Sequence, residues 1–387
     1  MNTSMSSTST SHTSTMVNTT SRHLVIMAAG TGGHIMPGLA VADEMKRRGW
    51  TVSWLGTTGG MENRLVPPAG IPLDTISFSG LRGKGVMGGL LGSFKLLKSF
   101  AECARILKTR QSVAVLGMGG YVCFPGGLMA KARGLRLVMV NADAALLLSN
   151  KALLPLTNVL ACGFDGPAAR HAVARVTGNP VRAEIEAIAP PAQRFAGREG
   201  PLRVLVVGGS LGARALNEII PQALALIPVG QRPRITHQAG MANLDALKAS
   251  YVKAGLNPAV DAEVLPFINN MAQRLADCDL IICRAGAITV SELCAAGVPS
   301  VLIPLVVSTT AHQRDNALYM AEHGAAVHLP QPELSAASLA QHLQSLQRSE
   351  LLSMAEKAHR LARLQSAAAV ADAIEENVKP AAVKASQ

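Results

Sequence analysis

Gly208-Gly209-Ser210-Leu211-Gly212-Ala213-Arg214 follows the apolar run Leu202-Arg203-Val204-Leu205-Val206-Val207 and precedes a helical pattern from Arg214 to Leu226. A β-branched strand therefore ends at two glycines, and a helix begins directly after them. Such a turn presents free backbone N–H groups at a helix N-terminus, where a phosphate can bind. Many α/β folds use glycine there only to turn the chain, so this motif alone leaves both interpretations open.

A second glycine turn, Gly30-Thr31-Gly32-Gly33-His34, lies near the start of the chain. The apolar stretch His23–Ala29 before it reads as a buried strand, and the pattern after it predicts a helix from Pro37 to Arg48. Val52–Leu55 is the next strand. This βαβ unit predicts a parallel sheet.

The same alternation continues along the chain and restarts after a Pro- and Gly-containing stretch, 183–200, which we interpret as a linker. The pattern predicts two Rossmann-like α/β domains, 21–182 and 201–363, with the active site in the cleft between them. A helical region ends the chain, and its last part, about 364–380, is expected to pack back on the first domain. Further strands are expected at Ile71–Ser77, Val113–Leu116, Leu135–Val140, Val159–Ala161, Arg234–Gln238, Ala262–Val264, Leu280–Cys283, Ser300–Ile303 and Ala326–His328, and the terminal helical region at Leu351–Val378.

The net charge of +11 is confined to the first half of the 387 residues. Residues 1–200 contain 21 basic and 10 acidic side chains, whereas residues 201–387 contain 15 of each. A basic first half suits an anionic partner such as nucleic acid, a phospholipid surface or a phosphorylated substrate. Aromatic residues are scarce and do not interleave with the basic ones, which argues against nucleic acid.

The remaining composition indicates a protein with reduced thiols and no membrane span. The six cysteines form no CxxC pair and stand in apolar surroundings, so we expect buried thiols and no metal site. Residues 1–20 are mostly Ser, Thr and Asn and predict a disordered tail, with Met16 as an alternative start. Residues 293–307 are the most apolar stretch, but glycine, serine and proline interrupt it.

The sequence disfavours two classes of nucleotide-binding protein. Dinucleotide-binding folds carry an acidic residue at the end of the second strand, where it binds the ribose. Here that strand ends in Gly56-Thr57-Thr58-Gly59, which contains no carboxylate. A P-loop is excluded because the chain contains no G-K-[ST] motif.

Seven ordered stretches between about residues 23 and 375 resemble the MurG family of bacterial glycosyltransferases, glycosyltransferase family 28. Together they are specific, whereas any one of them alone is not. They are Gly30-Thr31-Gly32-Gly33-His34 with Pro37-Gly38, Ser79-Gly80-Leu81-Arg82-Gly83-Lys84-Gly85, Gly117-Met118-Gly119-Gly120-Tyr121-Val122, Gly178-Asn179-Pro180-Val181-Arg182, Gly208-Gly209-Ser210, Phe267-Ile268-Asn269-Asn270-Met271 and Arg284-Ala285-Gly286-Ala287-Ile288-Thr289-Val290-Ser291-Glu292.

The resemblance implies the GT-B fold and a role in peptidoglycan synthesis. The family transfers N-acetylglucosamine from UDP-N-acetylglucosamine to the muramyl 4-hydroxyl of lipid I, an undecaprenyl-linked acceptor, with inversion, giving lipid II and UDP. Two alternatives stay open: a related glycosyltransferase with another lipid or polyketide acceptor, and a binding protein on the same fold.

The resemblance also implies a donor site. It assigns the pyrophosphate to Ser210 and the turn around it, the uracil to Ile268, the ribose hydroxyls to Glu292 and the sugar hydroxyls to Gln313. Arg182 is expected near the pyrophosphate, since a guanidinium can bind it bidentately. The other residues that the resemblance assigns to UDP-N-acetylglucosamine are Thr31, Gly32, Gly33, Asp143, Ala287, Ile288, Thr289, Val290 and Ser291.

His34 is the candidate general base, because its pKa in water lies near neutrality. Capping the helix and binding the acceptor phosphate are its other possible roles. Helix N-termini and Arg182 can hold the pyrophosphate, so we expect no metal and no other cofactor.

A basic and apolar stretch around 82–108 is the candidate membrane surface. The resemblance implies that it rests on the cytoplasmic face of the inner membrane, where lipid I is anchored, and that proteins of wall synthesis and division are further partners. A polybasic patch gains about 1 kcal/mol per charge near an anionic surface. The same apolar content is also typical of a helix that is buried in the core, and this is the alternative interpretation of the stretch. The stretch contains Arg82, Lys84, Lys95, Lys98, Arg105 and Lys108 among Val86, Met87, Leu90, Leu91, Phe94, Leu97 and Phe100.

The chain departs from the family pattern at three places. The family carries His-Glu-Gln-Asn where this sequence has Val140-Asn141-Ala142-Asp143, so Asp143 stands in place of a donor-contacting Asn. Leu211 and His312 each replace a Gln. An Asp accepts hydrogen bonds but does not donate them, which puts the family contact at this position in doubt.

Overall fold

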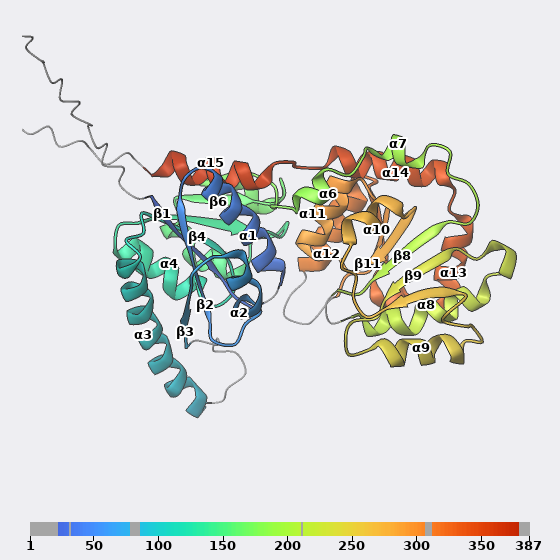
Figure 1. The fold of residues 1–387 in the computed structure, drawn as a ribbon, viewed down its shortest axis with the longest axis horizontal. Helices are drawn as coiled ribbons and strands as arrows, with labels where there is room; N and C mark the ends of the chain where they lie inside the picture. The colour runs from blue at the N-terminus through green and yellow to red at the C-terminus, as the bar shows by residue number, and fades with distance from the viewer. Residues whose placement is uncertain (1–21, 31, 78–85, 210–211, 306–311, 379–387) are drawn as a thin grey trace, which may run out of the picture.

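A computed structural model describes residues 22–30, 32–77, 86–209, 212–305 and 312–378 (Figure 1). Within these residues the chain forms two sheets in which every strand pair is parallel. The first, in the order β3-β2-β1-β4-β5-β6-β7, contains β1 (His23–Ala28), β2 (Thr51–Thr57), β3 (Leu73–Ile76), β4 (Ala114–Gly119), β5 (Arg136–Asn141), β6 (Val159–Cys162) and β7 (Ala174–Val176). The second, in the order β10-β9-β8-β11-β12-β13, contains β8 (Arg203–Val207), β9 (Arg234–Gln238), β10 (Ala262–Leu265), β11 (Leu280–Cys283), β12 (Ser300–Leu302) and β13 (Ala326–His328).

Both faces of the first sheet are buried, as the unbroken apolar runs require. Successive side chains of β1 point to opposite faces: Leu24 and Ile26 join one hydrophobic cluster, and Val25 and Met27 join another. This arrangement confirms the prediction of two Rossmann-like domains. The short strand β7 was not predicted, because its three residues carry no apolar run.

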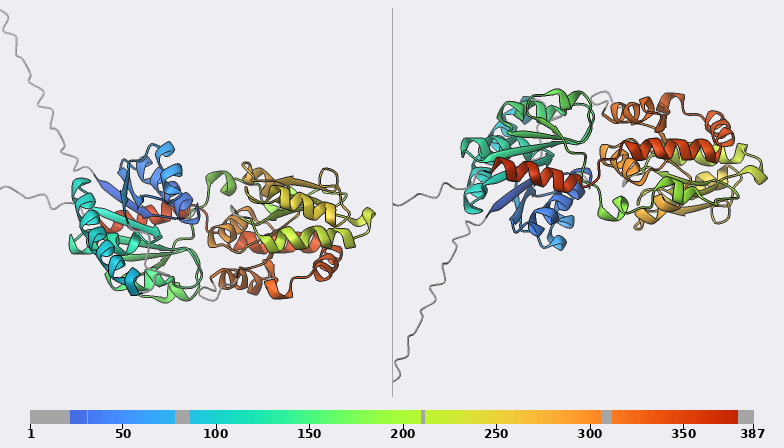
Figure 2. Two further views of the ribbon diagram at one scale, coloured as in Figure 1. Left: turned by 90° about the horizontal axis from the view of Figure 1, so that it is seen from below. Right: turned by 90° about the horizontal axis from the view of Figure 1, so that it is seen from above.

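Helices surround both sheets, and in Figure 2 the two domains lie side by side with the chain crossing between them twice. The longest helix, α3, projects beyond the first sheet (Figure 1). The helices are α1 (Gly32–Arg47), α2 (Glu62–Leu65), α3 (Val86–Thr109), α4 (Cys123–Ala132), α5 (Leu148–Leu153), α6 (Ala183–Glu186), α7 (Pro191–Phe195), α8 (Arg214–Leu226), α9 (Leu244–Lys253), α10 (Met271–Asp277), α11 (Ala287–Ala296), α12 (His312–Glu322), α13 (Ala336–Ser345), α14 (Arg348–Arg360) and α15 (Ser366–Asn377).

Helix α1 begins at Gly32, five residues before the predicted start at Pro37. Proline is favoured in the first turn of a helix, which led to the prediction, but here Pro37 lies inside the helix and is buried. Because proline has no backbone N–H, the helix lacks one hydrogen bond to the preceding turn at this position. The consequence is that His34 belongs to the first turn of α1 instead of the loop before it.

The helical region predicted from Leu351 to Val378 is two helices, α14 and α15, rather than one. They are separated at 361–365, where Gln365 has a left-handed backbone (φ 57°). Figure 1 shows α14 along the second domain and α15 along the first. Val370, Ala371 and Ile374 of α15 pack in the first domain's core. The Ala-rich composition alone does not reveal a break imposed by packing on two domains.

Arg48 binds α15 to the first domain through ion pairs. Its guanidinium lies 2.6 Å from Asp372 and 2.8 Å from Glu375, and the indole N–H of Trp50 donates to Glu375 at 2.9 Å. The expected linker, 183–200, contains the short helices α6 and α7, which contact α11 and α14 of the second domain.

The cysteines are all free and buried, as the sequence predicted. Burial raises the pKa of the Cys103 thiol to about 12, so this thiol is protonated at neutral pH. None of the helices in the described ranges is long and apolar enough to cross a membrane.

Candidate active site

Both glycine turns lie at the carboxyl ends of their parallel strands, the edge at which open α/β sheets bind ligands. The first turn leads into α1 and the second into α8. Three sets of hydrogen bonds join the two domains near this edge, through Asn316, Asn179 and Arg182. The candidate site is therefore built from both domains.

His34 lies in the first turn of α1, at the end of β1. Its Nδ1 lies 3.4 Å from the carbonyl oxygen of Ala29, which accepts the Nδ1 proton and leaves Nε2 as the acceptor. Burial lowers the pKa of His34, while the Ala29 carbonyl and the charge of Asp143 oppose that shift. A neutral imidazole at neutral pH is competent as a general base.

Gly119 closes the space beside the imidazole ring. A Cβ at this position would lie 2.5 Å from Cδ2 and 2.7 Å from Nε2 of His34. Its φ of +134° also disfavours any L side chain. This glycine, in the third Gly-rich stretch of the sequence, therefore allows the ring to occupy its place against β4.

Glu62, which sequence reasoning missed, anchors the first glycine turn. This buried carboxylate accepts hydrogen bonds from the backbone N–H of Gly30 at 3.1 Å and from the backbone N–H and hydroxyl of Thr57 at 2.8 and 2.7 Å. It thus reaches the end of β2, the place where a dinucleotide-binding fold carries its ribose carboxylate. Burial alone would raise the pKa of Glu62, but these hydrogen bonds lower it.

Glu62→Gln is expected to lower the free energy of unfolding by about 1–3 kcal/mol at pH 7, because an amide cannot accept from all three donors. A lowered pKa gives stability above the ordinary value of 4.5 that is lost as the pH falls through the folded-state pKa. The difference between variant and wild type should therefore shrink below pH 4.5, as urea unfolding at several pH values will measure. Exposed Glu322→Gln is the control, and an equal loss in both variants would contradict the anchoring role.

On the second domain, a cavity of about 700 Å³ opens at the other glycine turn. Gly212 has a φ of +75°, and a Cβ there would lie 2.1 Å from the carbonyl oxygen of Ala239, so only glycine fits. The N-terminal ends of α8 and α11 both border this cavity, and two helix N-termini suit a pyrophosphate. The lining comprises Gly208, Gly209, Gly212, Ala213, Arg214, Ala215, Glu218, Arg284, Gly286, Thr289, Leu305, Gln313 and Gln331.

Arg182 and Glu292 bind each other across the two domains. Nε and Nη2 of Arg182 donate to Oε1 of Glu292 at 3.1 and 3.0 Å. Burial raises the pKa of Glu292, and the hydrogen bonds and charge of Arg182 oppose that shift. The resemblance implies that both groups contact the donor.

The other residues predicted to bind the donor differ in their position relative to this cavity. Thr289 and Gln313 line the cavity, and Gln313 accepts a hydrogen bond from the Leu305 N–H at 2.9 Å. Ile268 is buried and belongs to the same hydrophobic cluster as Val290. Thr31 and Ser210 lie outside the described residues.

Six further predictions concern small or buried positions. Gly32 and Gly33 belong to the first turn of α1. Ala287 is buried and Ile288 is half-buried at the start of α11, so a ligand would chiefly contact their backbone N–H groups. The Ser291 hydroxyl accepts from Asn179 at 2.9 Å. Asp143 accepts from Asn316 at 2.9 Å.

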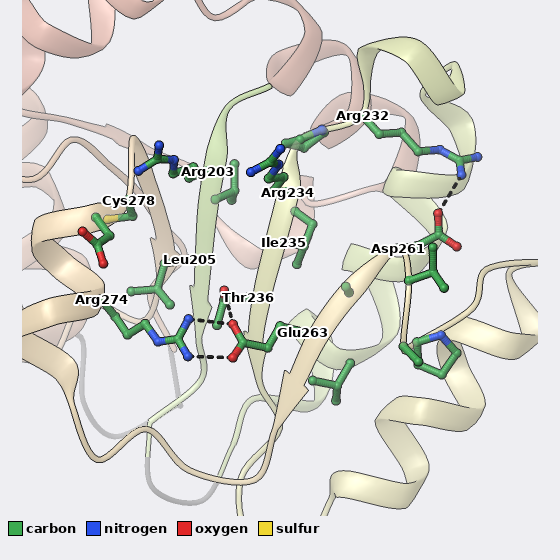
Figure 3. A pocket seen from close by; sticks show the side chains of 18 of the residues that line it. Arg203, Leu205, Arg232, Arg234, Ile235, Thr236, Asp261, Glu263, Arg274 and Cys278 are labelled. Carbon is green, nitrogen blue, oxygen red and sulfur yellow. Dashed lines mark hydrogen bonds and ion pairs between the residues drawn. The ribbon is translucent and has the colours of Figure 1, made fainter. Parts of the chain in front are cut away.

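A second cavity, of about 760 Å³, lies beside the first residues of β8, β9 and β10 (Figure 3). Arg274 pairs with Glu263 there, and Arg232 pairs with Asp261 (dashed lines in Figure 3). This second cavity lies at the amino ends of the strands, whereas the glycine turn lies at their carboxyl ends. It is therefore separate from the candidate active site.

Comparisons with known proteins match both domains to one glycosyltransferase family. The glycosyltransferase family 28 N-terminal domain matches residues 24–158, and the family 28 C-terminal domain matches residues 203–376. The UDP-N-acetylglucosamine–N-acetylmuramyl-(pentapeptide) pyrophosphoryl-undecaprenol N-acetylglucosamine transferase of Methylibium petroleiphilum is 66% identical over 93% of this chain and 99% of its own length. The protein of the same name from Chromobacterium violaceum is 63% identical over 91% of this chain and 97% of its own length.

Solved structures show the same architecture. The crystal structure of Acinetobacter baumannii MurG has a TM-score of 0.78 and 36% identity, covering 92% of this chain and 99% of that one. The calicheamicin glycosyltransferase CalG4 has a TM-score of 0.62 at 16% identity over 92% of this chain and 98% of its own, and it shows the fold alone.

Proposed function

Because the chain belongs to glycosyltransferase family 28, we propose that it transfers N-acetylglucosamine from UDP-N-acetylglucosamine to N-acetylmuramyl-(pentapeptide) pyrophosphoryl-undecaprenol. The names of its most similar relatives support this donor and this acceptor. The observation that carries the proposal is an imidazole on the first domain whose Nε2 can accept a proton, together with a cavity bordered by two helix N-termini on the second domain.

In the proposed reaction the acceptor 4-hydroxyl attacks C1 of the donor sugar. The bond from this oxygen to C1 forms, the C1–O bond to the β-phosphate breaks, and UDP leaves with inversion at C1. Nε2 of His34 takes the hydroxyl proton. The negative charge that develops on the leaving pyrophosphate is stabilised at the N-termini of α8 and α11, so the proposal includes no metal and no other cofactor.

The donor domain provides the remaining contacts in this proposal. Gln313 binds sugar hydroxyls from the cavity wall. Glu292, once released from Arg182, accepts from the vicinal ribose hydroxyls, and Arg182 turns to the pyrophosphate.

The test is acceptor-dependent release of UDP. The purified chain is incubated with UDP-N-acetylglucosamine and a lipid I analogue, and UDP is quantified with each substrate omitted in turn. Release only when both are present supports the proposal. Release without acceptor, or none with both, contradicts it.

We also propose that the first domain rests on the cytoplasmic face of the inner membrane, where an undecaprenyl-linked acceptor is held. Along α3, Lys95, Lys98, Arg105 and Lys108 are exposed, and Leu97 among them is 67% exposed. Tyr121, beside the end of β4, is 53% exposed. An apolar surface among basic side chains suits an anionic bilayer.

Lys95→Gln with Lys108→Gln should weaken binding to phosphatidylglycerol-containing vesicles roughly 30-fold, since each charge contributes about 1 kcal/mol near such a surface. Co-sedimentation measures this effect, and neutral phosphatidylcholine vesicles should show little difference. The control exchanges two exposed lysines of α9 on the other domain, Lys248→Gln with Lys253→Gln. Equal weakening in both double variants would contradict the assignment of this face.

A further inference from the structure

The cavity beside the first residues of β8, β9 and β10 (Figure 3) has a volume of about 760 Å³, which suits a small organic molecule. Four arginines line it: Arg203, Arg232, Arg234 and Arg274. The proposed glycosyl transfer uses none of these side chains, because it takes place at the carboxyl ends of the strands.

The carboxylates in the lining of this cavity already have hydrogen-bond donors. Asp261 accepts from Nη1 of Arg232 at 3.2 Å, and Glu263 accepts from both terminal nitrogens of Arg274 at 2.6 Å. The third carboxylate, Asp277, accepts at 2.8 Å from a glutamine one turn earlier on α10. Four arginines against three carboxylates leave the lining with an excess of positive charge.

The other two arginines form a pair of like charges on neighbouring strands. Arg203 and Arg234 are the first residues of β8 and β9 and lie directly opposite each other in the parallel register. Their side chains therefore leave the same face of the sheet, from backbones about 4.8 Å apart. Both are exposed at the same end of the sheet (Figure 3), and neither guanidinium has a hydrogen-bond or ion-pair partner among the residues that the structure describes.

An anion between these two guanidinium groups would remove an unfavourable interaction, because like charges directly opposite on adjacent strands destabilise a sheet. A guanidinium binds two phosphate oxygens at once, so two of them can enclose one phosphate or pyrophosphate. Val229 and Val260, which are 77% and 80% exposed, line the same cavity. They provide apolar surface for the organic part of a ligand.

We propose that this cavity is a second ligand site, in which Arg203 and Arg234 bind the phosphate or pyrophosphate group of a small organic molecule. Arg232 and Arg274 keep their carboxylate partners and form the walls of the site. The inference goes beyond the proposed transfer reaction and does not depend on it.

Titration of protein labelled with ¹⁵N-arginine follows this site directly, with inorganic pyrophosphate as the probe. The side-chain Nε–H resonances of Arg203 and Arg234, assigned by their absence in Arg203→Gln and Arg234→Gln, should move together with one Kd. The resonance of exposed Arg360 at the end of α14 should move little. Equal shifts in sodium chloride of the same ionic strength would show general screening and overturn the proposal. These resonances report on the cavity whether or not UDP-N-acetylglucosamine is a substrate.

Each arginine should bind pyrophosphate poorly without the other. In Arg203→Gln, the Arg234 resonance should need at least about tenfold more pyrophosphate to move, because a charge-assisted bidentate contact is lost. Lys248→Gln, which removes an exposed charge from α9 of the same domain, should leave the Kd unchanged. Both arginines are exposed, so the variants should fold as the wild type does. An unchanged Kd in Arg203→Gln would mean two independent surface charges and contradict the site.

A phosphate group can reach the cavity on a soluble molecule or on a lipid headgroup. Co-sedimentation of the double variant Arg203→Gln with Arg234→Gln on phosphatidylglycerol vesicles distinguishes these sources. Vesicle binding equal to that of wild type assigns the site to a soluble phosphate ester, and a loss of about tenfold or more assigns it to a headgroup. In either case the affinity for pyrophosphate has to fall, and a double variant that binds pyrophosphate as wild type does would overturn the proposal.

Discussion

Replacement of His34 by Ala should lower kcat by about 10²- to 10⁴-fold, the usual contribution of a general base. UDP binding should change little, because the cavity that binds the donor in our proposal lies on the other sheet. Steady-state release of UDP from UDP-N-acetylglucosamine and a lipid I analogue measures the first effect, and calorimetric titration with UDP measures the second.

The pH dependence of the activity gives a second test of His34. Because burial lowers the pKa of His34 below its usual 6.5, the wild type should be fully active at neutral pH and lose activity as the pH falls below 6.5. His34→Ala should lack this limb. Exposed His171→Ala on the same domain should behave as wild type. A kcat within a few-fold of wild type in His34→Ala would exclude the base role.

The sequence predicted the sheets well because burial on both faces leaves unbroken apolar runs. Helix α8 has the predicted bounds, Arg214–Leu226, since it begins directly after a glycine turn and ends where the helical pattern ends. The predicted start of α1 was wrong because Pro37 is common in a first turn, and sequence alone cannot tell that packing keeps this proline inside the helix.

The residues of the candidate site that sequence reasoning missed act through contacts between distant parts of the chain. Glu62 binds Gly30, 32 residues earlier, and Asn316 binds Asp143, 173 residues earlier. Neither pairing has a local pattern. In the sequence, Glu62 could have been noticed as a carboxylate two residues after Gly59-Gly60. Asn316 could have been noticed as a polar residue at a position of the helix that faces the core.

Gly119→Ala should lower kcat roughly 100-fold although no reacting group is removed. The new Cβ would lie 2.5 to 2.9 Å from Cδ2, Nε2 and Cγ of His34, so the imidazole has to move. A displacement of about 1 Å of a catalytic group can cost about 10²-fold in rate. The same UDP-release assay measures the effect.

Backbone strain is the competing explanation for such a loss, and Gly134→Ala isolates it. Gly134 also has a positive φ, +70°, but a Cβ there would meet nothing within 4 Å. Gly134→Ala should lose about 1 kcal/mol of stability from the left-handed backbone and keep its activity, whereas Gly119→Ala should lose more stability and also activity. Because Gly119 acts through the imidazole, adding Gly119→Ala to His34→Ala should lower kcat no further. A further fall in the double variant, or an equal fall in Gly134→Ala, would show that strain and not displacement of His34 limits the rate.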